Sequence, residues 1–341
     1  MDEVIRRLLE SDEPSVRYKT RVGVLGEDPE SPSIEALRQK IKTSTRVTQL
    51  LSNLEPDGRI APVGQVYKKW TGAHWVLASL ADIGYPPGDP SLAPAVDQVV
   101  DWWLRPEGLR EWICEEAPPP QKDRGVPIMQ GRARRCASQQ GNALFSAMAQ
   151  GFADDRTEQL AACLLRWQWD DGGWNCDRHP EASHSSFWES LIPLRALARY
   201  AEDAGSPDAR AAARRAAEVF LTRRLYRGAA DGRIMNPRFT RLHYPRYWRY
   251  DVLFALKVMA EAGLIGDVRC SDALDLLESK RLPGGGWAAE ERLYRTSALA
   301  ATGRDLVDWG PVGRGRLNEW VTTDALTVLT AAGRTSPHPG E

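Results

Sequence analysis

The sequence has no long hydrophobic run and no excess of one charge. None of its apolar stretches approaches the roughly 18 residues that a membrane-spanning helix needs, and the acidic start Met1-Asp2-Glu3 is unlike a secretion signal. The 45 Lys and Arg residues nearly balance the 46 Asp and Glu residues, which argues against a nonspecific nucleic-acid binder. We therefore expect a soluble cytoplasmic protein that neither spans a membrane nor binds nucleic acid.

Closely spaced cysteine pairs are also missing. The five cysteines form an odd set, which argues against a disulfide framework and favours reduced thiols, some of them metal ligands. Phenylalanine is scarce, with six residues against 13 Trp and nine Tyr. Large rings with a polar atom suit either structural corners or a pocket that contacts a ligand.

Strand-like alternation is absent, whereas helical periodicity is strong. Five nearly all-apolar segments recur: 74–84, 136–151, 186–200, 251–263 and 318–333. Four of them end at glycine, the usual helix terminator. Between them lie amphipathic segments such as 207–226, which has one charged side. This alternation predicts an all-α fold, with inner buried helices wrapped by outer ones and with no place for strands.

Glycine turns mark a repeat. Similar strings begin at Asp57, Asp171, Asp231 and Gly284. The first interval is about twice as long as the other two, which are about 50 to 60 residues each, as in repeat architectures. We predict about five helical hairpins. Residues 1–45 would form an N-terminal helical extension on the ring, 46–333 the ring, and 334–341 a disordered tail; the Pro/Gly-rich stretch 118–131 would form a long loop.

Two of these turns resemble a known signature. Gln168-Trp169-Asp170-Asp171-Gly172-Gly173-Trp174 is similar to the Gln/Trp repeat of squalene and terpene cyclases and of protein prenyltransferase β subunits, and Arg281 to Trp287 resembles it without the Gln. The resemblance implies an α/α toroid from about Arg46 to Gly333, a cavity that binds isoprenoids, and turn tryptophans that brace the ring. The Asp-x-Asp-Asp acid of the cyclases is absent, which favours prenyl transfer or a different cyclisation.

A metal site is predicted where the inner helices begin, because their N-terminal ends should meet at one rim. Cys136 starts the second inner helix, and Cys176 and His184 precede the third. Thiolate and imidazole are ligands that zinc prefers, and His74 or Asp177 would complete the set. Alternatively, both cysteines are small buried apolar groups, or Cys176 is a reactive thiol. Ser186 to Glu189 fits a capping box for the third helix.

A substrate site is predicted around the segment 238–251, in which arginines alternate with aromatic residues. Arginines could clamp a phosphate while the rings pack against an apolar chain. The alternative is a solvated loop whose rings brace the entrance of the helix. The predicted substrate-binding residues are Lys69, Trp75, Trp188, Arg241, Arg246, Trp248, Arg249 and Tyr250.

Asp251 is the first candidate proton donor, with Cys176 and His184 as the other candidate catalytic residues. A carboxyl group at the mouth of an apolar cavity can have a raised pKa, although an Asp at this position can also simply cap its helix. Asp324 lies inside the last inner helix, where a buried carboxylate needs partners or a function.

These observations favour an enzyme of terpenoid or prenyl metabolism that binds an isoprenoid or similar apolar, diphosphate-bearing molecule. The alternatives are a zinc-dependent transferase and a noncatalytic binding or scaffold module that uses the outer surface. The sequence leaves open whether a partner subunit completes the site.

Overall fold

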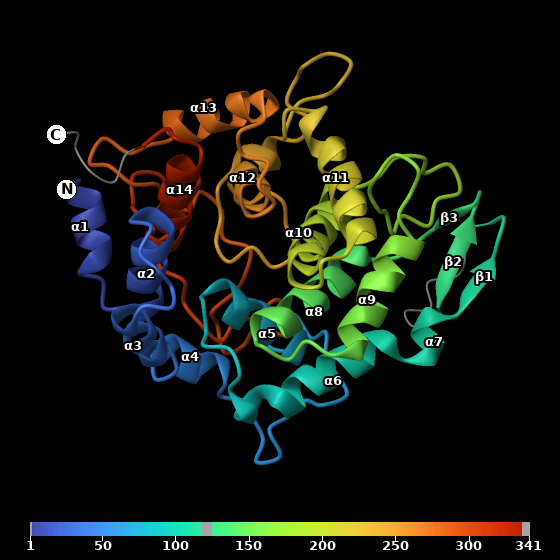
Figure 1. Ribbon diagram of the computed structural model, residues 1–341, viewed down its shortest axis with the longest axis horizontal. Helices are drawn as coiled ribbons and strands as arrows, with labels where there is room; N and C mark the ends of the chain where they lie inside the picture. Colours follow the sequence, from blue (N-terminus) through green and yellow to red (C-terminus); the bar gives the residue numbers. More distant parts are fainter. Residues whose placement is uncertain (1, 117–124, 336–341) are drawn as a thin grey trace.

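The computed structural model describes residues 2–116 and 125–335 (Figure 1). Most of the predicted C-terminal tail and part of the predicted loop 118–131 lie outside these ranges. Arg334, at the start of that tail, forms ion pairs with Asp275 and Glu278 at 2.7 and 2.8 Å. Within the described ranges, every helix is too short or too polar to cross a bilayer.

Each of the five apolar segments forms a helix, as predicted. They are α5 (Ala73–Asp82), α8 (Ala137–Ala149), α10 (Phe187–Asp203), α12 (Val252–Glu261) and α14 (Glu319–Ala331). Each packs against the next in this order. The N-terminal helix α2 (Pro14–Lys19) and its π-helical continuation η1 (Thr20–Val24) pack against α14, and Figure 1 shows all six around a common centre.

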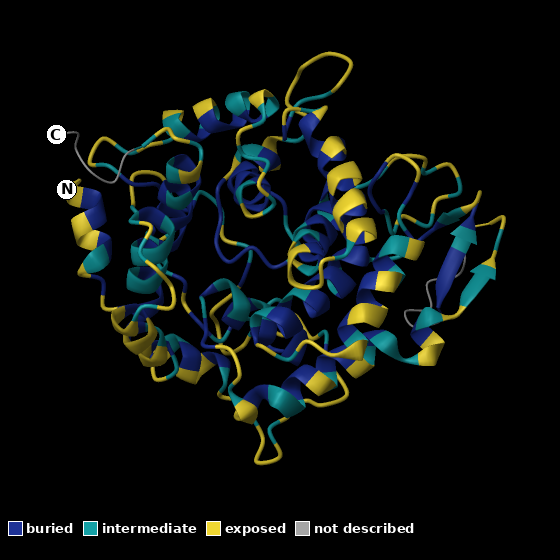
Figure 2. Ribbon diagram, viewed as in Figure 1, coloured by how far each residue is buried: buried dark blue, intermediate teal, exposed yellow. Residues whose placement is uncertain are grey.

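A second set of helices lies outside the first (Figure 1). It contains α6 (Ala93–Leu104), α9 (Asp155–Arg166), α11 (Pro207–Leu221) and α13 (Ser271–Ser279), with α1 (Glu3–Leu9) and α3 (Pro32–Ile41) beside α2 and with α4 (Thr45–Leu50) next to α3. Figure 2 shows that these helices expose one side, as predicted: in α11, Ala212, Ala216 and Phe220 are buried whereas Arg214 is exposed. The connections include short helices, α7 (Pro106–Leu109), η2 (Pro90–Leu92), η3 (Pro237–Thr240) and η4 (Val268–Cys270).

The expectation of no strands was wrong. Three strands, β1 (Glu111–Ile113), β2 (Val126–Met129) and β3 (Arg132–Ala133), form a small sheet outside the helices (Figure 1). β1 pairs with β2 in parallel, and β2 pairs with β3 antiparallel. Strands of two to four residues are too short to produce a recognisable alternation, and β2 occupies part of the segment predicted to be a loop.

The two turn tryptophans occupy equivalent positions. The Trp174 indole donates to the Leu164 carbonyl of α9 at 2.9 Å, and the Trp287 indole donates to the Leu277 carbonyl of α13 at 2.7 Å. The backbone N–H of each donates to a hydroxyl on the following inner helix, that of Ser190 at 3.0 Å or Thr322 at 2.9 Å. Each tryptophan therefore ties an outer helix to the next inner one.

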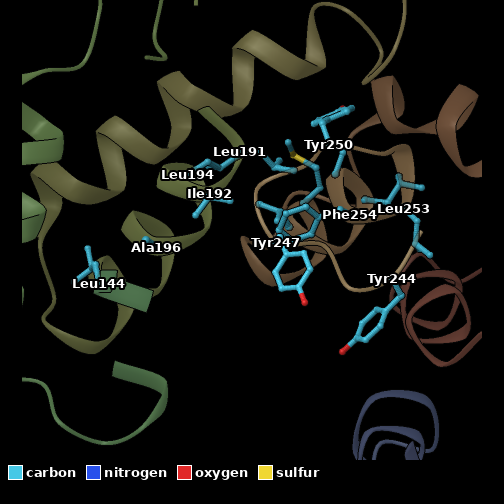
Figure 3. Packing of buried hydrophobic residues seen from close by; sticks show 14 of the residues in the cluster. Leu144, Leu191, Ile192, Leu194, Ala196, Tyr244, Tyr247, Tyr250, Leu253 and Phe254 are labelled. Atoms are coloured by element: carbon cyan, nitrogen blue, oxygen red, sulfur yellow. The ribbon is translucent and has the colours of Figure 1, made fainter. Parts of the chain in front are cut away.

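The close contact of α8 with α10 depends on a glycine. A Cβ atom at Gly141 would lie 2.9 Å from the backbone nitrogen of Pro193, so any side chain there would push the helices apart. Figure 3 shows the apolar packing that follows along α10, from Leu191 to Ala196, and continues into the segment before α12 at Tyr250.

Candidate functional site

Aromatic side chains from the segment 241–250 occupy the centre of the fold. Tyr244 stacks on Trp320 at 5.1 Å between ring centroids, and Tyr247 stacks on Trp70 at 4.0 Å. Between these tyrosines and Phe254 remains a cavity of about 30 Å³. This volume accommodates about one water molecule and not an isoprenoid. At this position the structure lacks the wide tryptophan-lined cavity that the sequence predicted.

Buried ion pairs fill the remaining central space. Asp324 forms ion pairs with Lys19 at 2.9 Å, with Arg246 at 2.9 Å and with Lys257 at 3.3 Å. Lys257 also pairs with Asp82 at 2.7 Å. Asp324 therefore has the partners that a buried carboxylate requires. Arg246, predicted to bind substrate, is only 4% exposed and is instead part of this network.

Asp251 is the N-cap of α12, not a poised proton donor. It is fully buried; its carboxylate accepts from the Phe254 N–H at 2.7 Å and pairs with Arg246 at 2.9 Å and with His243. Burial acts to raise the pKa of Asp251, but the nearby Arg246 and His243 outweigh it and lower the pKa to about 2. The carboxylate is therefore charged at neutral pH, contrary to the predicted catalytic acid.

Two predicted substrate-binding rings also belong to the core. Trp75 has no exposed surface and packs at 4.9 to 5.5 Å against Tyr67, Trp70 and Tyr247. Tyr250 is 3% exposed, and its hydroxyl donates to the Leu225 carbonyl. In these positions neither ring reaches a ligand.

Two other predicted residues, Lys69 and Arg249, do come together. They line a surface pocket of about 390 Å³, here called the basic pocket. Most of the other lining residues come from the loop that follows the second tryptophan turn, residues 291–303. The remaining lining residues are Trp70, Arg238, Glu291, Arg292, Leu293, Tyr294, Arg295, Thr302 and Gly303.

The basic pocket has an unbalanced charge. It combines five cationic side chains with one acidic side chain, Glu291. Among the described residues, only Arg292 of the five cations forms an ion pair, with Asp308 at 3.8 Å. By contrast, a larger hollow of about 480 Å³ beside the C-terminal ends of α10 and α12 has two arginines and two glutamates in its walls. The basic pocket therefore differs from the larger hollow in carrying an excess of positive charge.

Two cations of the basic pocket, Lys69 and Arg249, have lowered pKa values, in part because other positive charges lie nearby. Burial and then the nearby Arg249 lower the pKa of Lys69. Burial and then Arg238 lower the pKa of Arg249, while Glu291 acts in the opposite direction. A bound anion would relieve this repulsion.

Aromatic rings adjoin the cations. The Lys69 ammonium lies 5.0 Å from the centroid of Trp248 and 5.4 Å from that of Trp70, and Trp188 contacts Trp248 edge-on at 5.6 Å. Of the predicted residues, Trp248 thus lies beside Lys69 and Trp188 lies against Trp248, and neither is among the residues that line the pocket. Arg241 is exposed and is not part of its lining.

A second cluster joins two of the predicted metal ligands with a residue that was not predicted. The thiols of Cys136 and Cys176 and the carboxylate of Glu189 have ligand atoms within 4.8 Å of one another; we call this the thiol–carboxylate cluster. The Cys176 thiol lies 3.4 Å from Glu189 Oε1. Hydrogen bonding with Cys136, burial and the Glu189 charge raise the pKa of Cys176, and burial raises that of Glu189.

His184 does not join the cluster, and the predicted capping box does not form. His184 is exposed, and its carbonyl accepts from Asn175 at 2.8 Å. Ser186 begins α10 without a side-chain cap. Glu189 instead reaches to α8, where its Oε2 accepts from the Ser138 N–H at 3.1 Å and hydroxyl at 2.8 Å.

The suggested fourth ligands also lie apart from the cluster. His74 is buried, and its Nδ1 accepts from the Trp103 indole at 3.1 Å; burial lowers its pKa to about 3. Asp177 is exposed and accepts from the His179 N–H at 2.9 Å.

The basic pocket and the thiol–carboxylate cluster are neighbours. Lys69 is close enough to Arg249 and to Cys136 for both to act on its pKa. Tyr67, two residues earlier, is close enough to Cys136 and Glu189 that their charges, after burial, raise its pKa. The segment 67–69 therefore lies near both sites.

Several site residues were missed by sequence reasoning. Glu189 was interpreted as a local cap because it fits a four-residue motif, whereas its partner is 51 positions away. Arg238 was noted only as part of the arginine-rich segment. Arg292 and Arg295 follow a tryptophan turn in an irregular loop that has no motif of its own. The high content of arginine in the segment 238–251 and in the loop after Trp287 was the sequence feature that could have pointed to these residues.

No family model and no curated protein sequence matches this chain. Similar solved structures include a protein from Actinoplanes, 16% identical, covering 97% of this chain and 98% of that one with a TM-score of 0.46. They also include the apo type II terpene cyclase MstE from Scytonema, 14% identical, covering 87% and 99% with a TM-score of 0.27. These distant likenesses carry no argument about function, which must come from the residues of this chain.

Proposed function

We propose that the basic pocket binds the phosphate or diphosphate head of a small molecule. The excess of four positive charges in its walls is the observation that carries this proposal. Arginine guanidinium groups match phosphate oxygens in geometry and charge, and a lysine adds a compact point charge.

An isoprenoid diphosphate is the proposed ligand class. Trp248, which is half-buried beside Lys69, offers apolar ring surface next to the cations, which suits a ligand with an anionic head and an apolar chain. In this proposal the chain lies along the rim of the fold and not in its centre, which the tyrosines fill. The adjacent cluster of two thiols and a carboxylate, whose ligand atoms are close enough to hold a metal ion, favours an enzyme over a scaffold.

We also propose that the helices close into an α/α toroid. Arg38 of α3 donates to the Gly84 carbonyl just after α5 at 3.2 Å, and a Cβ atom at Gly84 would meet the Tyr18 ring of α2. These contacts join α2 and α3 to α5 and so support closure of the ring between the N-terminal helices and the first inner helix. The site would then lie where the inner helices α8, α10 and α12 begin.

Calorimetric titration with inorganic pyrophosphate and with geranyl diphosphate tests the binding proposal. Hydrogen bonds to charged groups contribute about 1.5–3 kcal/mol, so Arg249→Ala should weaken pyrophosphate binding by about 10- to 150-fold. Added salt should weaken binding by the wild type, because the site is open to solvent. Geranyl diphosphate should bind more tightly than pyrophosphate if its chain contacts the rings.

Arg241→Ala is the matched control, since this exposed arginine lies in the same segment but outside the lining. It should bind pyrophosphate like the wild type, and both variants should keep the wild-type melting temperature. No binding by the wild type, or an equal loss in the two variants, would refute the proposal.

A further inference from the structure

A metal site independent of the basic pocket emerges from the thiol–carboxylate cluster. We propose that Cys136, Cys176 and Glu189 bind one zinc ion or a similar thiol-preferring divalent cation, with a fourth position open to water or substrate. Two sulfur ligands and one oxygen ligand fit the donor types that zinc accepts.

The distances are close to those of such a site. With Zn–S near 2.3 Å and Zn–O near 2.1 Å at tetrahedral angles, the sulfur and oxygen ligands should be about 3.6 Å apart and the two sulfurs about 3.8 Å apart. The Cys176 Sγ to Glu189 Oε1 distance is 3.4 Å, and all three ligand atoms lie within 4.8 Å of one another. Shifts of about 1 Å or less would complete the geometry.

The cluster is held in place from two sides. A parallel backbone bridge pairs Arg134 with Asn175, so the chain segments that carry the two cysteines run side by side into the cluster. Arg134 also donates to the Ala182 carbonyl at 2.7 Å and to the Pro180 carbonyl at 3.3 Å, which fixes the loop after Cys176. Preorganised ligands of this kind lose little freedom on binding a metal.

Glu189 has the arrangement expected of a metal ligand with outer support. It is only 9% exposed, and its Oε2 is occupied by Ser138 while its Oε1 faces the Cys176 thiol. Outer hydrogen bonds of this kind orient metal-binding carboxylates. A cation here would replace the thiol protons and join three ligands that would otherwise repel one another when charged.

The experiment is titration of the reduced full-length protein with Co²⁺, followed by competition with Zn²⁺. The wild type should bind one Co²⁺ per chain and develop the near-ultraviolet thiolate-to-cobalt absorption. Cys176→Ser should lose about half of that absorption, because one of two thiolates is gone. Its metal affinity should fall by more than the roughly 10- to 100-fold that loss of a supporting residue costs.

Two further variants separate ligation from folding. Glu189→Gln keeps an oxygen that accepts from Ser138, so it should fold, keep the thiolate absorption and bind metal at least about tenfold more weakly. Cys163→Ser removes a thiol of α9 outside the cluster and should bind like the wild type.

Absence of thiolate absorption in the wild type, or equal affinity in Cys163→Ser, Cys176→Ser and Glu189→Gln, would overturn the metal site. Pyrophosphate binding is measured separately on the same metal-free protein. Failure of the metal site therefore leaves the proposed anion site standing, and the reverse also holds.

Discussion

Replacing Asp324 with Asn should destabilise the fold strongly, because this carboxylate is shared by three buried cations. The central network contains Lys19, Arg195, Arg246 and Lys257 and the acids Asp82, Asp251, Glu261 and Asp324. Its four positive and four negative charges balance. The nearby cations lower the pKa of Asp324 against the effect of burial, so the group is charged in the folded protein.

The size of the expected loss of stability follows from the buried positive charge that Asp324→Asn leaves unpaired. Asp324→Asn leaves one buried positive charge without compensation, and removal of one partner from a buried ion pair costs about 3–5 kcal/mol. Lys19 has the fewest alternative partners, since within the described part of the chain it forms an ion pair with Asp324 alone. The double variant Asp324→Asn with Lys19→Met restores the charge balance. Its loss of free energy of unfolding should be smaller than the sum of the losses in the two single variants, by at least about 1 kcal/mol.

Urea unfolding followed by circular dichroism gives the free energies. Asp308→Asn is the control, because Asp308 is exposed and lies 3.8 Å from its partner Arg292; its effect should stay below about 1 kcal/mol. A loss of less than 1 kcal/mol in Asp324→Asn, or strict additivity in the double variant, would refute the account of the network.

Two further predictions concern stability. The pKa of Asp251 is about 2 in the fold against an ordinary 3.8, so its contribution of about 2 kcal/mol is present above pH 4 and is lost as the pH falls toward 2. Between pH 4 and pH 2, the free energy of unfolding should fall less steeply with pH in Asp251→Asn than in the wild type. Identical slopes would count against the lowered pKa of Asp251. Trp174→Ala should cost about 3–5 kcal/mol, because a buried ring and its hydrogen bond to Leu164 are lost together. A wild-type melting temperature in this variant would show that the turn does not brace the fold.

The helices could be predicted from the sequence because their signals are local. Each inner helix is an apolar segment with a glycine or another stop near its end, and the structure begins and ends each within a few residues of the predicted range. Strands β1 to β3 could not be predicted, because they owe their pairing to segments brought together by the fold.

The candidate site was predictable only in part. Lys69, Arg249, Cys136 and Cys176 were found because charge and thiol chemistry are visible in single residues. Whether a residue lies in the core or at the rim depends on packing, which is why Trp75 and Arg246 were misplaced. Glu189 was missed as a ligand because its position is set by contact with the neighbouring helix α8 and not by its own sequence.

The predicted domain boundaries and the cytoplasmic location stay predictions. The structure does bring the N-terminal helix α2 and η1 against α14, so the chain before residue 46 contributes directly to the helical assembly.

The most direct test of the account is a crystal structure of the protein with inorganic pyrophosphate. The account predicts one pyrophosphate in the basic pocket, within hydrogen-bonding distance of the Lys69 ammonium and the Arg249 guanidinium and close to Trp70. A pyrophosphate bound elsewhere, or an empty pocket at a concentration that saturates the protein in solution, would contradict it.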